Sequence, residues 1–240
     1  MIIFPAIDLM DGRAVRLLQG RKADATDYGD PADVARKWQE QGANVLHMVD
    51  LDGAFDGQSQ NGAAVRRIVK ETGLTVQLGG GIRTLEDIAL RIEDYGVARC
   101  ILGTVAIENP ELVREACKRY PGRIACGIDA RGGRVAVRGW VDQSELTALE
   151  LALSMRDMGV DTIIYTDIAR DGMLTGPNVP ETAALVKATG MRIIGSGGVS
   201  GMDDLEALSE AGCYGAIVGK ALYTGAIALG EAINTFEKNA

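Results

Sequence analysis

The sequence predicts an α/β fold, a closed (β/α)8 TIM barrel, and three observations support this prediction. Short apolar runs alternate with helix-like patterns eight times along the 240 residues. The runs are rich in Val and Ile and mostly lack polar alternation, which is typical of strands buried on both faces. The chain also repeats its motifs at about half its length, as expected of a duplicated half-barrel. A doubly wound open sheet is the alternative, but it explains the repeat less well.

The eight units follow one another in order, each with a strand and then a helix. The expected strands cover residues 2–7, 45–50, 75–79, 100–103, 123–129, 161–166, 191–196 and 216–219. The expected helices lie near 32–41, 61–71, 84–94, 109–119, 147–157, 180–188, 202–210 and 225–236. Asp30-Pro31 marks the start of the first helix, and Thr84 with Asp87 has the spacing of a capping box at the third. No low-complexity linker interrupts the pattern, so one domain is expected over 1–240, with internal halves of about 1–120 and 121–240.

The repeat is clearest in its glycine turns. Residues 75–106 and 191–222 each have the pattern of strand, glycine turn, helix, strand and second glycine turn. The equivalent glycines are Gly80 and Gly197, Gly81 and Gly198, and Gly103 and Gly219, at offsets of 117, 117 and 116. Asp8 likewise corresponds to Asp129, at an offset of 121. Each half of the barrel therefore carries one aspartate and one set of glycine turns.

These glycine turns predict two phosphate sites. A glycine pair after a strand lets the backbone approach an anion and direct N–H groups at it, and the last two strands of such barrels often hold a phosphate. Tight turns also need glycine for purely structural reasons, and Arg83 could simply begin a helix. The predicted phosphate- and substrate-binding residues are Gly80, Gly81, Arg83, Gly103, Thr104, Gly176, Gly197, Gly198, Gly219 and Lys220.

Asp8 and Asp129 are the predicted acid–base pair. They end the first and fifth strands, which face each other across an eight-stranded barrel, so a substrate between them would have one carboxylate on each side. The structural alternative is that each aspartate caps neighbouring N–H groups. Thr166 ends the sixth strand and could orient Asp129 or the substrate. Asp50 is expected to be structural at the barrel rim, and His47 is expected to be a satisfied barrel residue.

Two connections are expected to be loops over the barrel mouth. The first, about 9–31, is long and carries Arg16 among several cations and glycines, as mobile lids often do. The fifth, about 130–146, carries Arg138 and Trp140, and an aromatic ring in a polar loop could stack on a planar ligand.

The composition excludes several classes of protein. A net charge of −8 argues against nucleic acid as the main partner. No apolar run approaches 18 residues and no charged-then-apolar leader opens the chain, so no membrane insertion or secretion is expected. Four cysteines without CxxC spacing suit free thiols in the cytoplasm, and a single histidine argues against a His-based metal site. No helix face has an obvious apolar surplus, so a monomer is expected.

The motifs together resemble the histidine-biosynthesis phosphoribosyl isomerase, which acts on phosphoribosylformimino-5-aminoimidazole carboxamide ribotide. The resemblance covers essentially the whole chain through PAIDLMDGRAVRL, HMVDLDGAF, LGGGIRT, GIDAR, RGW, YTDIARDGMLTGPN, GSGGVS and AIVGKAL. It implies an Amadori rearrangement of an aminoaldose with a phosphate at each end, without metal or cofactor. It further implies that Asp8 is the general base, that Asp129 is the general acid assisted by Thr166, and that Trp140 stacks on the imidazole carboxamide.

Three other functions remain as alternatives. The cyclase of the same pathway resembles this barrel, but it usually has Cys and Lys where this chain has Ala6 and Arg16. A bifunctional isomerase that also acts on phosphoribosylanthranilate tends to have Ser at the position of Gly79, although Arg16 and Arg138 match its arginines. A non-catalytic phosphate-binding barrel is disfavoured, because two carboxylates in its mouth would repel a dianion.

Overall fold

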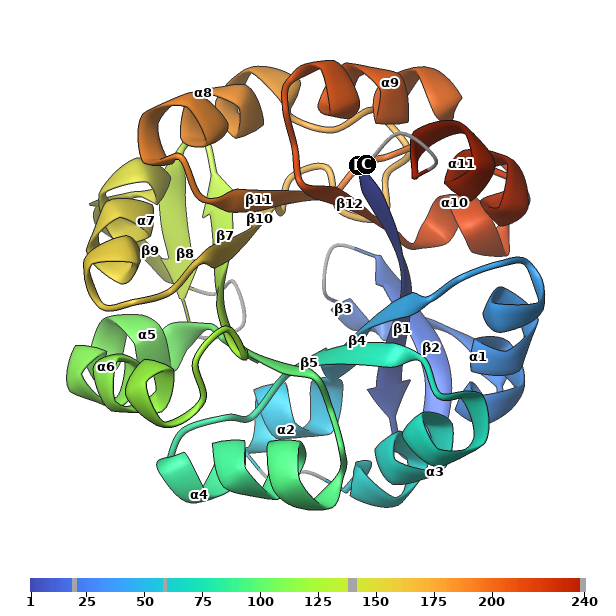
Figure 1. Ribbon diagram of the computed structural model, residues 1–240. Coiled ribbons are helices and arrows are strands. Elements are labelled where there is room, and N and C mark those ends of the chain that lie inside the picture. The colour runs from blue at the N-terminus through green and yellow to red at the C-terminus, as the bar shows by residue number, and fades with distance from the viewer. Residues whose placement is uncertain (19–20, 58–59, 138–141, 238–240) are drawn as a thin grey trace.

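The structure is a computed structural model that describes residues 1–18, 21–57, 60–137 and 142–237. Eight parallel strands within these residues close into a barrel, which confirms the predicted fold (Figure 1). Their order around the barrel is β1 (Ile2–Met10), β4 (Val45–Asp50), β5 (Thr75–Gly79), β6 (Arg99–Leu102), β7 (Ile124–Arg131), β10 (Thr162–Asp167), β11 (Arg192–Ser196) and β12 (Gly215–Val218). Parallel pairing of β12 with β1 and of β7 with β10 completes the ring.

Helices surround the barrel on its outside, as Figure 1 shows. The expected helices are present as α1 (Pro31–Glu40), α3 (Gly62–Thr72), α4 (Leu85–Ala89) continued by the π-helical turn η1 (Leu90–Asp94), α6 (Pro110–Arg119), α7 (Ala148–Asp157), α8 (Val179–Thr189), α9 (Met202–Glu210) and α11 (Leu229–Phe236). Asp30 caps α1 through the N–H groups of Ala32 and Asp33, and Thr84 with Asp87 forms the predicted capping box. None of the helices in the described ranges is long and apolar enough to cross a membrane.

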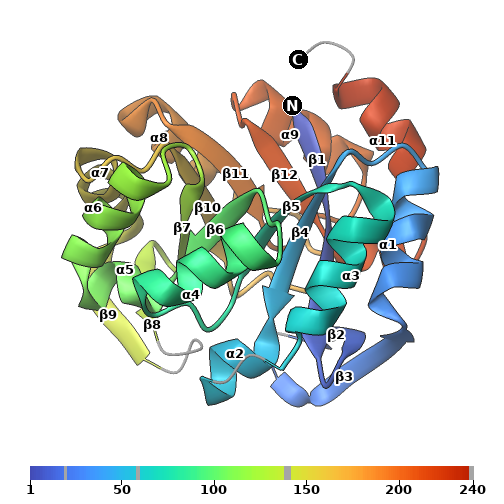
Figure 2. The ribbon, with the colours of Figure 1, turned by 60° about the horizontal axis from the view of Figure 1, so that its bottom comes forward.

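The two long connections contain strands, so the prediction of loops there was wrong. The first forms β2 (Arg13–Leu18) and β3 (Arg21–Gly29), and the fifth forms β8 (Arg134–Val137) and β9 (Asp142–Thr147). β2 pairs antiparallel with β1, and β8 pairs antiparallel with β7, so each hairpin extends a barrel strand. Figure 2 shows both hairpins at one end of the barrel, with the N-terminus at the other.

Three short helices also fall outside the predicted pattern. α2 (Leu51–Asp56) follows β4 directly, α5 (Thr104–Glu108) follows β6, and α10 (Lys220–Tyr223) follows β12. α5 and α10 occupy equivalent places in the two halves. Both begin at a glycine, Gly103 and Gly219, whose backbone angles are nearly the same, φ −102° and ψ −112° against φ −104° and ψ −101°.

The core of the described residues has two main parts, and a small third cluster of Val15, Leu17 and Leu51 lies under the first hairpin. Most buried apolar side chains lie between the barrel and the helices, and a smaller cluster fills the barrel interior. The buried members of the interior cluster are Phe4, Ala6, Ile101, Ala125, Ile164, Ile194 and Ile217. Branched and aromatic side chains of this kind make the interior of a barrel a packed core.

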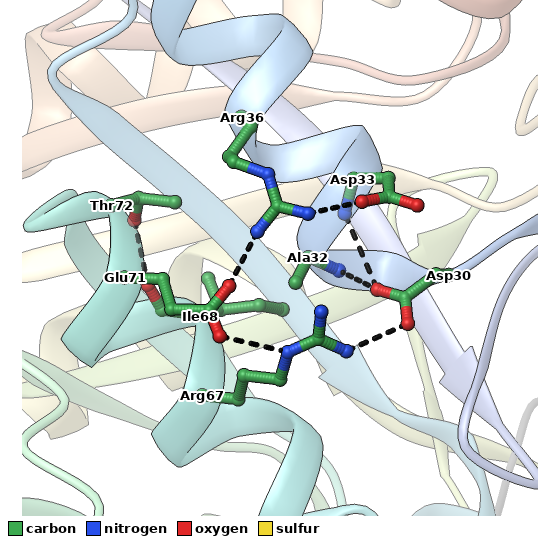
Figure 3. Close-up of polar contacts among 8 residues, drawn as sticks. All are labelled: Asp30, Ala32, Asp33, Arg36, Arg67, Ile68, Glu71 and Thr72. Atoms are coloured by element: carbon green, nitrogen blue, oxygen red, sulfur yellow. Dashed lines mark hydrogen bonds and ion pairs between the residues drawn. The ribbon is translucent and has the colours of Figure 1, made fainter.

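A polar network joins α1 to α3 on the outside of the first half (Figure 3). The Arg67 guanidinium lies 2.7 Å from the Asp30 carboxylate, which also caps α1, and 2.9 Å from Glu71. Arg36 pairs with Glu71 and with Asp33. Both arginines therefore share the Glu71 carboxylate and hold the two neighbouring helices together.

Candidate active site

One pocket, of about 630 Å³, opens at the carboxyl ends of the barrel strands. Its lining includes the ends of strands from both halves together with β2 and the turns that follow β5, β6, β11 and β12. This is the face on which barrels of this type carry their active sites. The pocket is therefore the place where side chains from distant parts of the chain can act on one ligand.

Asp8 lies in this pocket and is paired with Arg16. The Asp8 Oδ2 atom is 2.9 Å from the Arg16 guanidinium, and the side chains are only 13% and 12% exposed. The pairing arises because β2 folds back antiparallel on β1. Burial raises the pKa of Asp8 to about 6, although Arg16 lowers it and Asp171 adds a further raising effect. At neutral pH this carboxyl group is mostly ionised and has a pKa suited to accepting a proton.

Asp129 lies on the opposite side of the same pocket. It is on β7, which is four strands from β1 in either direction around the barrel. Thr166, on the adjacent strand β10, is the register partner of Asp129 and also lines the pocket. The predicted pair of carboxylates thus faces a shared cavity, with Thr166 next to the second one.

The first glycine turn lies between β5 and α4. Gly80 and Gly81 have φ values of +99° and +68°, a conformation that side chains rarely adopt. A Cβ on Gly81 would stand 2.7 Å from the Gly53 backbone, so the close approach also requires glycine. Gly103 at the start of α5 lacks a side-chain cap, and Thr104 lines the pocket beside it. A glycine turn followed by a helix N-terminus has the geometry that directs backbone N–H groups at an anion.

The second glycine turn has the same geometry on the opposite side of the barrel. Gly197 and Gly198 both have φ of +89°, and a Cβ on Gly197 would stand 2.7 Å from the carbonyl oxygen of Asp167. Gly219 begins α10 without a side-chain cap, as Gly103 begins α5. The Lys220 Nζ donates to the carbonyl oxygen of Gly172 at 2.9 Å.

A second cation belongs to this second turn. The Arg16 guanidinium occupies the space where a Cβ on Gly219 would stand, so it reaches both Asp8 and the second turn. Positive charge at this place favours an anionic ligand group.

The rim aspartates are structural, in agreement with the expectation for Asp50. Asp50 caps α2 through the Gly53 N–H and accepts from the Asn61 side chain at 2.7 Å. Asp167 accepts from the Asn178 side chain at 2.9 Å. In both halves the asparagine stands 11 positions after the aspartate and begins the next long helix.

The structure brings nearly all the predicted site residues to one pocket. Those that line it are Asp8, Gly80, Gly81, Arg83, Gly103, Thr104, Asp129, Thr166, Gly197, Gly198, Gly219 and Lys220. Gly176 was predicted to bind the substrate but is not on this lining. Its N–H donates to the carbonyl oxygen of Gly198 at 2.9 Å and so supports the second glycine turn. Arg83 lines the pocket and also lies against Gly57 at the end of α2. Trp140 and Arg138 lie outside the described residues.

Several pocket residues were not assigned to the site from the sequence. Asp171, which was interpreted as a turn residue, lines the pocket and is close enough to raise the pKa of Asp8. His47 lines it from β4, and Ser196 from the end of β11. The sequence did contain a signal for Ser196, because a residue at a strand end directly before Gly197-Gly198 is expected at the barrel mouth. No group of three or more His, Cys, Asp or Glu side chains in the described ranges could hold a metal ion.

Comparison with known proteins places this geometry in a family. The family described as "Histidine biosynthesis protein" matches residues 2–228, nearly the whole chain. The chain belongs to this family. The match covers both aspartates, both glycine turns and the hairpins that extend β1 and β7. The matched span thus includes both halves of the barrel and every residue that lines the pocket.

Curated relatives align over almost their full length. A protein of Desulfitobacterium hafniense (strain DSM 10664 / DCB-2) is 53% identical over 97% of this chain and 95% of its own. Proteins of Syntrophotalea carbinolica and Dinoroseobacter shibae are 54% and 55% identical over 97% of this chain and 97% and 98% of their own. All three are named as an imidazole-4-carboxamide isomerase, and the name contains two 5-phosphoribosyl groups.

Proposed function

We propose that the protein is an isomerase of histidine biosynthesis. Its reaction is the Amadori rearrangement of the bisphosphorylated aminoaldose N'-(5'-phosphoribosyl)formimino-5-aminoimidazole-4-carboxamide ribonucleotide to the corresponding aminoketose. The observation that carries the proposal is the symmetry of the pocket. Two equivalent glycine turns lie four strands apart, and the carboxylates of Asp8 and Asp129 face the space between them. A single substrate with a phosphate at each end fits this arrangement.

The two glycine turns support binding of the two phosphates. Each turn combines glycines at positive φ with a short helix that begins at an uncapped glycine. Backbone N–H groups in such turns bind phosphate oxygens without needing a long side chain. Arg16 and Lys220 add positive charge at the second turn. Fixing both ends of the substrate holds its sugar between the carboxylates, which lowers the entropic part of the barrier.

The chemistry needs one acid and one base. Asp129, in its protonated form, donates a proton to the ring oxygen of the aminoaldose, so that the bond between C1 and this oxygen breaks and an iminium forms. Asp8, in its ionised form, removes the proton from C2, which gives an enolaminol. Protonation at C1 and loss of the hydroxyl proton then give the aminoketose. C2 is oxidised while C1 is reduced within one molecule, so no external electron acceptor takes part.

The geometry supports these roles through the surroundings of each carboxyl group. Burial brings the pKa of Asp8 to about 6, close to neutral pH, where general bases are most effective. The Arg16 guanidinium lies 2.9 Å from the Asp8 carboxylate and stabilises its ionised form by charge pairing. Thr166 is the register partner of Asp129, which supports a role in orienting its carboxyl group. Trp140 is proposed to stack on the imidazole carboxamide of the substrate.

The supporting experiment is turnover of the purified protein with the bisphosphorylated aminoaldose in the presence of EDTA. Formation of the aminoketose is the expected result. No conversion by folded protein with intact substrate would contradict the proposal. Phosphoribosylanthranilate, offered in a parallel reaction, tests the bifunctional alternative, which the names of the relatives do not favour.

We further propose that the protein acts as a cytoplasmic monomer. The large exposed apolar side chains in the described ranges are Phe55 on α2, Leu90 on η1, Leu149 on α7 and Met173 in the turn after β10, so they come from different parts of the chain. All four cysteines are free thiols, which is typical of a reducing compartment. Light scattering after gel filtration would reveal a dimer if the monomer prediction is wrong.

A further inference from the structure

Three polar residues form one row across neighbouring barrel strands. His47 on β4 is the register partner of Gln77 on β5, which is the register partner of Arg99 on β6. The side chains are linked in the same order. The Gln77 Nε2 atom is 3.1 Å from the His47 Nδ1 atom, and the Arg99 guanidinium donates to the Gln77 Oε1 atom at 3.3 Å. His47 and Gln77 are buried, so these contacts are shielded from bulk water.

The direction of each hydrogen bond follows from the chemistry of the groups. A guanidinium only donates, so the group of Gln77 that faces Arg99 is its oxygen. The group of Gln77 that faces His47 is then its NH₂, which also only donates. The His47 Nδ1 atom must therefore accept and carries no proton. In a neutral imidazole the proton is then on Nε2.

The row lies between two cavities, and its members line one or the other. Gln77 and Arg99 line a second cavity, of about 220 Å³, together with Ile2, Thr75 and Gly122 near the amino ends of the strands. His47 instead lines the active-site pocket. Its Nε2 atom makes no hydrogen bond within the described parts of the chain, and it is not among their buried polar atoms that lack a partner. This nitrogen is thus open to the pocket.

Burial keeps the ring of His47 neutral. Burial lowers the pKa of His47 to about 3, and the nearby Arg16 guanidinium contributes in the same direction. The ring therefore has one N–H group at every pH at which the protein would work.

We propose that Gln77 and Arg99 are positioning residues that hold His47 as the neutral Nε2–H tautomer and so give the pocket a fixed hydrogen-bond donor. The group that it binds is an oxygen acceptor of the substrate, namely the hydroxyl oxygen on the carbon that loses its proton. His47 is on β4 beside β1, the strand of Asp8. A neutral donor here stabilises negative charge on that oxygen as its hydroxyl proton leaves, and it adds no second cation beside Asp8, whose pKa Arg16 already lowers. The choice of acceptor rests on the proposed function, whereas the tautomer does not.

The tautomer can be measured directly because the chain has one histidine. Protein labelled with ¹⁵N-histidine would show two ring nitrogens by long-range ¹H–¹⁵N correlation at pH 7. The expected result is a protonated Nε2 and an unprotonated Nδ1. A protonated Nδ1, an imidazolium or an equal mixture in the wild-type protein would overturn the proposal.

Gln77→Glu tests the cause of the tautomer. The new carboxylate only accepts, so it would accept from Arg99 and from His47, and the proton is expected to move to Nδ1. An Nε2–H tautomer that persists in this variant would show that Gln77 does not set it. If Gln77→Glu fails to fold, Gln77→Met has a similar shape and is expected to give a mixture of tautomers. The matched control is Thr75→Ser, two positions away on β5 and on the same second cavity, and it should leave the tautomer of His47 unchanged.

Activity tests the role of the donor. In Gln77→Glu, kcat/KM for the bisphosphorylated aminoaldose should fall roughly tenfold to a hundredfold, because the nitrogen that faces the pocket now accepts. A changed tautomer with unchanged kcat/KM would overturn the donor role. If the wild-type protein does not convert this substrate, the proposed function fails, and the spectrum still decides the tautomer.

Discussion

Arg16 pairs with Asp8 at 2.9 Å inside the barrel mouth, and its guanidinium also fills the space beside Gly219. One cation therefore contacts the proposed base and the second glycine turn. It lowers the pKa of Asp8 against the stronger raising effect of burial. This links the binding of a phosphate to the protonation state of the base, because both depend on the same side chain.

Replacement of Arg16 should therefore move the acid limb of the pH–rate profile. In the wild-type protein kcat/KM is expected to rise as the pH increases through about 6, where Asp8 loses its proton. Arg16→Met removes the group that lowers this pKa, so the limb should move to higher pH and KM should increase. Arg13→Ala, on the same strand but about half exposed, is the control and should leave the limb in place. An unmoved limb in Arg16→Met would mean that another group titrates.

The glycine turns should not tolerate side chains. Gly197→Ser places a Cβ 2.7 Å from the Asp167 carbonyl oxygen at a φ of +89°, so we expect the free energy of unfolding to fall by about 1–3 kcal/mol. Inhibition by inorganic phosphate should also weaken. Gly201→Ser is the matched control, because its φ is −160° and no atom lies within 4 Å of the added Cβ. Urea unfolding compares them, and equal stabilities would refute the turn geometry.

Asn61 should be among the costlier polar residues to remove. Its side-chain amide donates to the buried carboxylates of Asp50 and Asp52 at 2.7 and 2.8 Å. Asn61→Ala leaves both without this donor, at a cost of about 1–3 kcal/mol or more in the free energy of unfolding. Asn109→Ala removes only an exposed helix cap, worth about 1 kcal/mol. The prediction fails if denaturant unfolding ranks the two variants in the opposite order.

The network between α1 and α3 should stabilise the protein only above acidic pH. The hydrogen bond from Arg67 is the largest cause of the lowered pKa of both Asp30 and Glu71, so the folded state binds these protons less readily than the unfolded chain. The stabilisation is present above the ordinary values of 3.8 and 4.5 and is lost as the pH falls through the lowered ones.

Arg67→Ala should accordingly lower Tm slightly at pH 7 and less at pH 3. High salt should reduce the difference, because these groups are largely exposed. Arg114→Ala breaks a single pair with Glu111 at 3.5 Å and should have a smaller effect. A loss in Arg67→Ala that is equal at both pH values would argue against the network.

The sequence predicts the barrel well because its signals are local and repeated. The eight strands and their following helices appear within a few residues of the expected bounds, since each buried strand is a short Val- and Ile-rich run. The hairpins were missed because their outer strands are largely polar, as in RKADATDYG of β3 and DQSELT of β9. Asp11-Gly12, both at positive φ, is the turn signal that could have revealed the first hairpin.

The site was predictable where it depends on strand ends and less so elsewhere. Asp8, Asp129 and the glycine turns could be placed because barrel topology brings strand ends together. The pairing of Arg16 with Asp8 requires the hairpin, and the position of Asp171 depends on how the turn after β10 folds over the mouth. The row from Arg99 to His47 requires the register of three strands, which the sequence does not contain locally.

Turnover of the bisphosphorylated aminoaldose with deuterium at C2 tests the central claim most directly, namely that Asp8 removes that proton in a pocket that holds both phosphates. Wild-type protein should convert the substrate, and so should the control Asp161→Asn, which lies directly before the amino end of β10 and away from the pocket. Both should convert the deuterated substrate more slowly if proton removal limits the rate. Asp8→Asn should bind the substrate but convert it about 10²–10⁴-fold more slowly. A folded Asp8→Asn variant that converts the substrate at the wild-type rate would contradict the account.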